Sequence, residues 1–155
     1  MRSLRWVALF VALLLLAAAC GDDSPSGESG GGDDAGGCEE GQTVTTDSGL
    51  EYEELECGDG DEVARGDTIV VHYTGTLENG DEFDSSRGGE PVSFALESGN
   101  LIEGWVEGIP GMREGGRRKL TIPPELGYGA AGNPPVIPAN ATLIFDVEVI
   151  EVQEP

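Results

Sequence analysis

The segment Leu101–Met112, LIEGWVEGIPGM, constrains the fold most, because it is the one helical pattern after Gly49 in a chain that otherwise has the patterns of strands and turns. Its large apolar residues recur at i, i+3, i+4 and i+7, which puts them on one face of a helix: Ile102, Trp105, Val106 and Ile109. Pro110 and Gly111 end this pattern after about two turns, and a helix so short needs a surface to pack on. We therefore expect one short helix packed against a sheet.

Several other segments have the alternating pattern of strands. Thr68–Leu77 is the clearest, because every second residue from Ile69 onwards is apolar or small and falls on one face. Asn79-Gly80 favours a tight hairpin after it. The remaining expected strands cover Leu50–Leu55, Asp81–Asp84, residues 92–96, Arg117–Ile122 and Leu143–Ile150. Pro123–Ala141 is a long loop rich in Gly and Pro, and a loop of that length in a compact domain is usually functional or disordered.

Trp105 has two possible roles in such a fold. As the largest apolar side chain on the expected helix, it is either a core residue or the floor of a binding pocket. Aromatic residues on the strands and in the long loop could surround a pocket of the kind that binds small ligands: Tyr73, Phe83, Phe94, Tyr128 and Phe145. His72 falls on the opposite strand face from Tyr73, so no Ser-His-Asp or Cys-His arrangement is expected.

The N-terminus has the pattern of an export signal. Arg2 and Arg5 precede an apolar run, Trp6–Ala19, that is too short to span about 30 Å of hydrocarbon. The run ends in LLAAAC, which resembles the lipobox of bacterial lipoproteins, with Cys20 as the acylated residue. Ordinary signal-peptidase cleavage after the Ala-rich stretch is the alternative. We expect a signal peptide at residues 1–19, a lipidated, disordered Gly- and Asp-rich tether at 20–41 and one folded domain at 42–155.

Charge and cysteine content exclude several partners. The formal net charge is −22, and removal of residues 1–19 would take away Arg2 and Arg5 but no acidic residue, which leaves −24. Nucleic-acid phosphates would be repelled, so nucleic acid is not an expected partner. Three cysteines without a CxxC pair and a single histidine offer no metal-ligand spacing. We expect neither a metal nor a cofactor.

Two cysteines remain if Cys20 is acylated. Export would place Cys38 and Cys57 in an oxidising compartment, where a disulfide bond between them is expected. Two free thiols are the alternative.

Three blocks of sequence together resemble one known family. They are VVHYTGTLENGDEFDSSR (Val70–Arg87), LIEGWVEGIPGMREGGRRKLTIPPELGYGAAG (Leu101–Gly132) and VIPANATLIFDVEVIEV (Val136–Val152). Their order and spacing resemble FKBP-type peptidyl-prolyl cis-trans isomerases from about Ser48 to Val152. The resemblance implies an α+β fold, an FKBP-like half-barrel in which a five- or six-stranded antiparallel sheet wraps around one short helix. It also implies a rotamase that needs no cofactor.

The resemblance also implies a set of pocket residues. The catalytic positions of the family fall on Asp84, Tyr73, Phe145 and Tyr128. The substrate-binding positions fall on Phe83, Val92, Leu101, Ile102, Trp105 and Ile137, with Trp105 as the floor. In that family the Tyr128 hydroxyl and the Ile102 backbone N–H donate hydrogen bonds to ligand carbonyls. The chain departs from the family after Arg87, where GGE is one residue short and no Arg pairs with Tyr73 and Asp84, and at Val92, where Phe is common.

These features lead to a functional hypothesis. We expect a prolyl isomerase that acts on proline-containing polypeptides and assists the folding of exported proteins as a chaperone. Its expected place is the outer face of the bacterial cytoplasmic membrane, as a monomer held only by its lipid anchor. Tacrolimus- or rapamycin-like macrocycles are possible ligands. The alternatives are a non-enzymatic module that holds proline-containing segments or a partner protein, and an inert structural lipoprotein.

Overall fold

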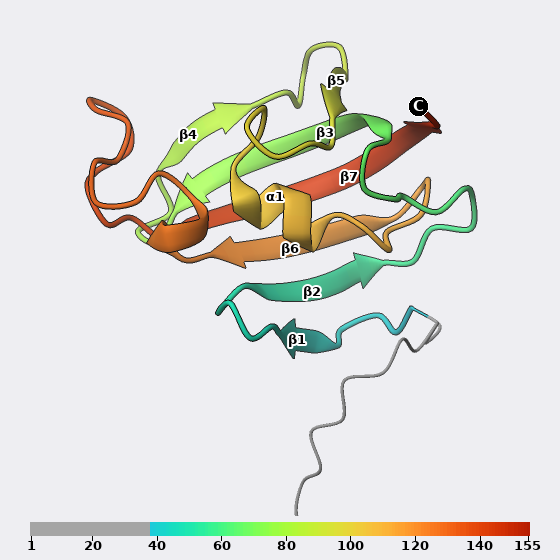
Figure 1. Ribbon diagram of the computed structural model, residues 1–155, viewed down its shortest axis with the longest axis horizontal. Coiled ribbons are helices and arrows are strands. Elements are labelled where there is room, and N and C mark those ends of the chain that lie inside the picture. Colours follow the sequence, from blue (N-terminus) through green and yellow to red (C-terminus); the bar gives the residue numbers. More distant parts are fainter. Residues whose placement is uncertain (1–37) are drawn as a thin grey trace, which may run out of the picture. The chain divides into compact units, whose positions relative to one another are not determined.

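The computed structural model describes residues 38–155, in which one short helix lies against an antiparallel sheet (Figure 1). The strands are β1 (Thr43–Thr45), β2 (Glu51–Glu56), β3 (Thr68–Leu77), β4 (Glu82–Ser85), β5 (Val92–Ala95), β6 (Arg117–Ile122) and β7 (Leu143–Gln153). The helix α1 spans Glu103–Gly108, and a 3-10 turn, η1, spans Pro124–Leu126. The expected signal peptide, Cys20 and most of the expected tether lie outside the described residues.

The sheet has seven strands in the order β1-β2-β6-β7-β3-β4, and β5 also pairs with β3. Every pairing is antiparallel. The predicted fold class, an antiparallel sheet with one short helix, is confirmed. The expected five or six strands become seven, because Thr43–Thr45 add a short strand to the outer edge of β2. These three residues contain one apolar side chain, that of Val44, and are too few for their alternation to distinguish a strand from a loop.

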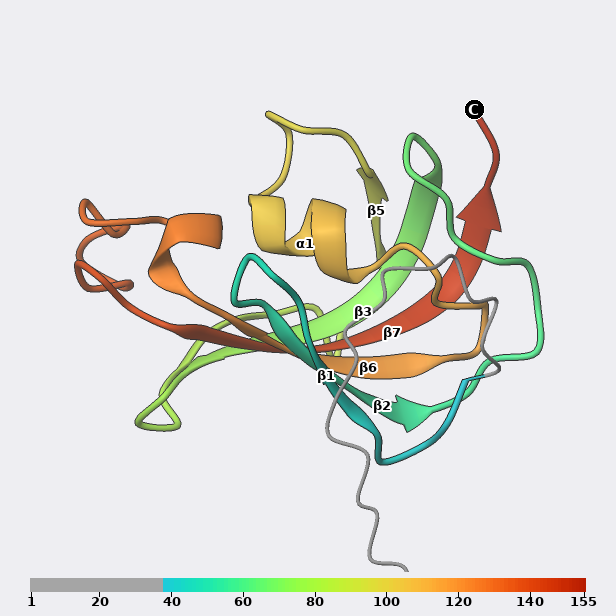
Figure 2. The ribbon, with the colours of Figure 1, turned by 60° about the horizontal axis from the view of Figure 1, so that its bottom comes forward.

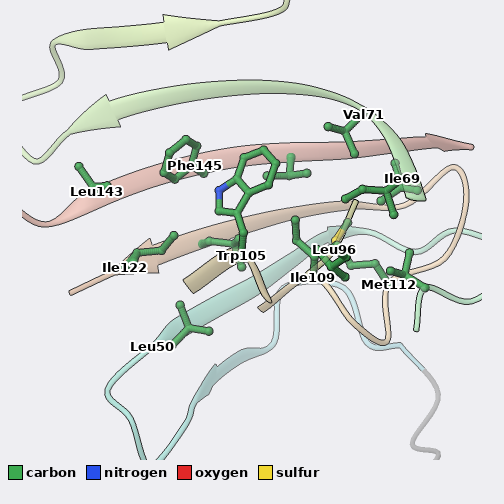
Figure 3. Close-up of a cluster of buried hydrophobic side chains, with 14 of the residues drawn as sticks. Leu50, Ile69, Val71, Leu96, Trp105, Ile109, Met112, Ile122, Leu143 and Phe145 are labelled. Atoms are coloured by element: carbon green, nitrogen blue, oxygen red, sulfur yellow. The ribbon is translucent and has the colours of Figure 1, made fainter. Parts of the chain in front are cut away.

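The core forms where the inner face of the sheet meets α1 (Figure 3). Alternate residues of the central strand β7 are buried there: Leu143, Phe145, Val147 and Val149. Ile69 and Val71 of β3 and Leu120 and Ile122 of β6 add to the same cluster. Because successive side chains of a strand point to opposite faces, this alternation leaves charged residues such as Asp146 on the outer face.

Helix α1 lies close to β6 because glycine occupies its contact face. A Cβ atom at Gly104 would lie 2.5 Å from Cγ2 of Ile122, and one at Gly108 would lie 2.8 Å from Cδ2 of Leu120. Of the predicted apolar face, Trp105, Val106 and Ile109 are buried, with Ile109 completely covered and Trp105 exposed by only 3 %, and Ile102 is partly buried. Figure 2 shows that α1 and the loop after β6 lie on the same side of the sheet. A cavity forms between them.

A disulfide bond joins Cys38 to Cys57 in the structure, with 5.8 Å between the Cα atoms. It links the residues before β1 to the turn after β2 and so fastens the first described residues to the sheet. No helix in the described part of the chain is long and apolar enough to span a membrane.

Candidate active site

A cavity of about 480 Å³ opens between α1, the sheet and the loop after β6. Aromatic and aliphatic side chains form most of its wall, with a few polar groups among them. It is lined by Tyr73, Phe83, Asp84, Phe94, Gly99, Asn100, Leu101, Ile102, Glu103, Trp105, Gly127, Tyr128 and Phe145. Segments far apart in the sequence thus contribute to one site, which is why no single motif defines it.

Trp105 forms the base of this cavity and is surrounded by other rings at right angles. Its ring lies 5.3 Å from Tyr73, 5.4 Å from Phe94 and 5.3 Å from Phe145, each in edge-to-face geometry. Its Nε1 is buried and has no hydrogen-bond partner within residues 38–155. Figure 3 shows this nitrogen on the side of the ring that faces Phe145. Edge-to-face packing fixes the rings relative to one another, so the cavity has a rigid base.

Gly75 makes room for the far wall. Phe83 packs edge-to-face on Phe145, with the ring centroids 5.4 Å apart. A Cβ atom at Gly75 would lie 2.6 Å from Phe83 and 2.9 Å from Phe145. A glycine at this position on the inner face of β3 is therefore required for the two rings to meet there.

Tyr73 and Asp84 form the one hydrogen-bonded pair of side chains in the wall. The Tyr73 hydroxyl donates to Oδ2 of Asp84 over 2.7 Å. Burial, followed by this hydrogen bond and the negative charge of Asp84, raises the pKa of Tyr73 to about 12. The phenol therefore stays protonated at neutral pH and holds the carboxylate in a fixed position. The pair can orient a substrate through charge and hydrogen bonding.

Two donors at the cavity have no partner in the described residues. Tyr128 lies in the loop after β6 and is 39 % exposed, and its hydroxyl makes no hydrogen bond within residues 38–155. The backbone N–H of Ile102, just before α1, is likewise free in that part of the chain. Both are therefore open to a carbonyl group in the cavity.

Eight of the ten residues expected at the pocket line this cavity, and two do not. Ile137 is 3 % exposed and belongs to the core cluster, and its backbone forms a bridge with Asn133. Val92 shares a face of β5 with Phe94, but the longer Phe94 side chain takes the place beside Trp105. Val92 and Ile137 are therefore not among the residues that line the cavity, and their expected contact with substrate stays a prediction.

Sequence reasoning also missed some of the lining. Phe94 lines the cavity but is not among the ten expected site residues, and its place follows from its register opposite Ile69. The other residues left out are Gly99, Asn100, Glu103 and Gly127. Three of these flank the predicted Leu101 and Ile102, so contact along the chain was an available signal. His72 lies outside the lining and hydrogen-bonds through Nδ1 to Oγ of Ser86 over 3.2 Å.

The fold is that of a class of enzymes that rotate prolyl peptide bonds. The model of the family described as FKBP-type peptidyl-prolyl cis-trans isomerase matches residues 60–150. The chain belongs to this family and is a peptidyl-prolyl cis-trans isomerase that acts on proline-containing peptides.

Known relatives cover most of the described residues. An FK506-binding protein of Neisseria meningitidis serogroup B is 55 % identical over 107 residues, which are 68 % of this chain and 98 % of the relative. The crystal structure of FkpA from Escherichia coli superposes with a TM-score of 0.67 at 49 % identity, over 75 % of this chain and 53 % of that chain. The crystal structure of AtFKBP13 superposes with a TM-score of 0.65 at 41 % identity, over 71 % of this chain and 98 % of that chain. The chain thus spans about half the length of the FkpA structure.

Proposed function

We propose that rotation of the X-Pro bond takes place in the aromatic cavity above Trp105. The observation that supports this most is the cavity itself, about 480 Å³ with a base of aromatic rings packed at right angles. Its size and apolar wall suit a proline ring and the amide before it.

The physical basis is desolvation of the amide. The C–N bond has partial double-bond character, and its rotation barrier is about 18–20 kcal/mol. Water stabilises the polar, planar form of the amide, so an apolar cavity removes that advantage. The twisted amide is less polar and fits the cavity better, which lowers the barrier without a covalent step.

Three groups in the wall would orient the substrate. The Tyr128 hydroxyl and the Ile102 N–H would each donate a hydrogen bond to a substrate carbonyl. Asp84, held by Tyr73 at 2.7 Å, would act through its charge on the twisted carbonyl. Asp84 would be an orienting group and not a general base, because the reaction transfers no proton.

We further propose that the enzyme assists the folding of exported proteins from the outer face of the bacterial cytoplasmic membrane. The sequence pattern at residues 1–20 supports this, as does the disulfide bond between Cys38 and Cys57, since disulfides persist in oxidising compartments. The enzyme would act there as a monomer anchored by lipid on Cys20.

Macrocycles of the tacrolimus or rapamycin type are proposed to compete for the same cavity. The name of the meningococcal relative, FK506-binding protein, supports this. Val92 and the absence of an Arg beside Asp84 are expected to weaken the binding.

The proposal is tested by an isomerisation assay with the purified protein on a short X-Pro peptide. Phe145→Ala opens the wall beside Trp105 and should reduce kcat/KM by about tenfold or more, a loss of over 1.4 kcal/mol of transition-state stabilisation. Ile150→Ala is the matched control, because Ile150 lies on the same strand, is 43 % exposed and lines no part of the cavity. A folded protein that accelerates no X-Pro peptide, or equal activity in the two variants, contradicts the proposal.

A further inference from the structure

The strand pairing of β3 is interrupted beside Tyr73. On this side β4 pairs with β3 from Thr74 onwards, and β5 pairs with it up to Val71. His72 and Tyr73 therefore face no strand residue there. Backbone groups at such a gap need other partners.

Ser86 fills this gap. Its Oγ accepts a hydrogen bond from the Tyr73 N–H over 2.9 Å, and its own N–H donates to the Tyr73 carbonyl over 3.0 Å. Ser85 adds a bond from its Oγ to the same carbonyl over 3.2 Å and also accepts one from the Arg87 N–H. Residues 85–87, which we call the Ser85–Arg87 clasp, thus bind both the N–H and the carbonyl group of Tyr73.

Arg87 fastens the clasp to the outer face of the sheet. Its Nη1 donates to Glu148 over 3.0 Å and its Nη2 to Asp146 over 3.1 Å, both on β7. Arg117 of β6 binds the same Asp146 through two further hydrogen bonds. Burial alone would raise the pKa of Asp146, but the hydrogen bonds and charges of Arg117 and Arg87 outweigh it and lower that pKa.

The clasp lies next to three residues of the cavity wall without lining the cavity itself. It binds Tyr73 directly, it follows Asp84 in the chain, and its partner Asp146 follows Phe145. Strand β4 has only four residues, and its register with β3 shifts between Gly75 and Thr76. The backbone hydrogen bonds between β3 and β4 therefore hold Asp84 only weakly. The contact between Asp84 and Tyr73 nevertheless depends on the spacing of these two strands.

We propose that Arg87 is a positioning residue, which acts through the Ser85–Arg87 clasp to hold Tyr73 and Asp84 in place for the isomerisation. Ion pairs on the outer face of the sheet then set the geometry of the cavity on its inner face. This inference rests on the proposed site of catalysis, because it assigns Arg87 a role in that site.

The first test compares kcat/KM of the full-length wild type, Arg87→Gln and Arg87→Lys on one X-Pro peptide. Arg87→Gln removes both ion pairs at a side chain that is 36 % exposed, so the fold is expected to persist. We expect kcat/KM to fall about three- to tenfold. Arg87→Lys should recover part of the loss. Arg113→Gln is the control, because it breaks a similar exposed ion pair, with Glu62, whose residues line no part of the cavity, and should stay within about twofold of wild type.

The titration of Tyr73, followed by NMR on ring-labelled tyrosine, separates positioning from a direct effect of charge. Loss of the Arg87 charge by itself would not lower the pKa of Tyr73, because removal of a cation can only disfavour the phenolate. A looser bond between Tyr73 and Asp84 would instead lower it from about 12 towards the ordinary value of about 10. We expect the pKa of Tyr73 to fall in Arg87→Gln and to move back towards the wild-type value in Arg87→Lys.

The outcomes are distinct. An unchanged kcat/KM, or a fall in activity without a lowered Tyr73 pKa, overturns the role of Arg87. If the wild type itself has no activity, the proposed site fails, and the titration alone decides whether the clasp positions Tyr73. If Arg87→Gln does not fold, Glu148→Gln removes one of its two partners and should shift activity and titration less, in the same directions.

Discussion

Asp84 is a charged residue in a wall made largely of rings, and one of its oxygens is held by Tyr73. If the substrate binds in this cavity as proposed, a carboxylate there would favour states that place positive charge beside it, and a carbonyl carbon that loses amide resonance gains such charge. Tyr128 contributes only a hydroxyl at the rim, where it is 39 % exposed. The two polar residues should therefore matter to different degrees.

Substitutions at these two residues test that order. Asp84→Leu should lower kcat/KM more than tenfold, because it removes the charge and leaves Tyr73 without its acceptor. Tyr128→Phe should reduce transition-state stabilisation by about 0.5–1.5 kcal/mol, since it removes one hydrogen bond and keeps the ring. Both are measured by the isomerisation assay on the same peptide. A larger loss in Tyr128→Phe than in Asp84→Leu would contradict the assigned roles.

The pH profile tests the absence of proton transfer. Because the pKa of Tyr73 is about 12, its phenol is protonated throughout the neutral range, and kcat/KM should be nearly flat between about pH 6 and 8. His72 lies outside the cavity lining, so His72→Ala should keep activity close to wild type. A bell-shaped profile that disappears in His72→Ala would show that a histidine takes part.

The same residue affects stability at alkaline pH. The pKa of Tyr73 is raised in the folded state, so the protonated phenol stabilises the fold fully below about pH 10, and this stability is lost as the pH rises towards 12. Unfolding by denaturant at pH 9 and 11 checks this. Tyr73→Phe should show a smaller loss than wild type over that interval.

The sequence predicts which face of a strand a residue occupies better than it predicts which other side chains that residue contacts. The alternation of β5 places Val92 and Phe94 on one face, but only the register opposite Ile69 and the length of the ring decide that Phe94 meets Trp105. Ile137 lies in a loop and is buried in the core, and no periodicity in the sequence indicates the direction of a loop side chain.

At the scale of elements, α1 depends on a cation from the sheet. The helix has only six residues, and Arg118 of β6 donates from Nη1 to the carbonyl of Gly108 at its end over 2.5 Å. The guanidinium also pairs with Glu54 and lies 4.4 Å above the ring of Tyr52. The sequence predicted the helix from its apolar face, but not this partner, since Arg118 is one of several basic residues in RRKLTI and is the buried one, 5 % exposed.

Removal of this cation should destabilise the protein strongly. Arg118→Ala leaves Glu54 nearly buried and unpaired, and the loss of one partner of a buried ion pair costs about 3–5 kcal/mol. Arg113→Ala is the matched control, because its pair with Glu62 is exposed and should contribute about 0–1 kcal/mol. Denaturant unfolding measures both free energies. Equal losses in the two variants would contradict the assignment of Arg118 as the support of α1.

For the molecule as a whole, the disulfide bond between Cys38 and Cys57 restricts the conformations of the unfolded chain. It closes a loop across a sequence separation of 19 residues, and the chain-entropy model gives such a bond roughly 3 kcal/mol. Replacement of both cysteines by serine should lower the free energy of unfolding by about that amount and leave kcat/KM unchanged, since neither residue lines the cavity. Two reactive thiols in the unreduced wild type would refute the bond.

Attachment to the membrane is the last feature that the sequence predicts for the whole molecule. The apolar run Trp6–Ala19 is too short to anchor the chain by itself, so retention would depend on lipid at Cys20. Cys20→Ser should therefore move the protein from the membrane to the soluble fraction or leave an uncleaved precursor. Cys38→Ser is the control, because it removes a different cysteine and should stay on the membrane. Mass spectrometry of the mature wild type decides between the two kinds of cleavage: an N-terminus without lipid would show that an ordinary signal peptidase processes the chain.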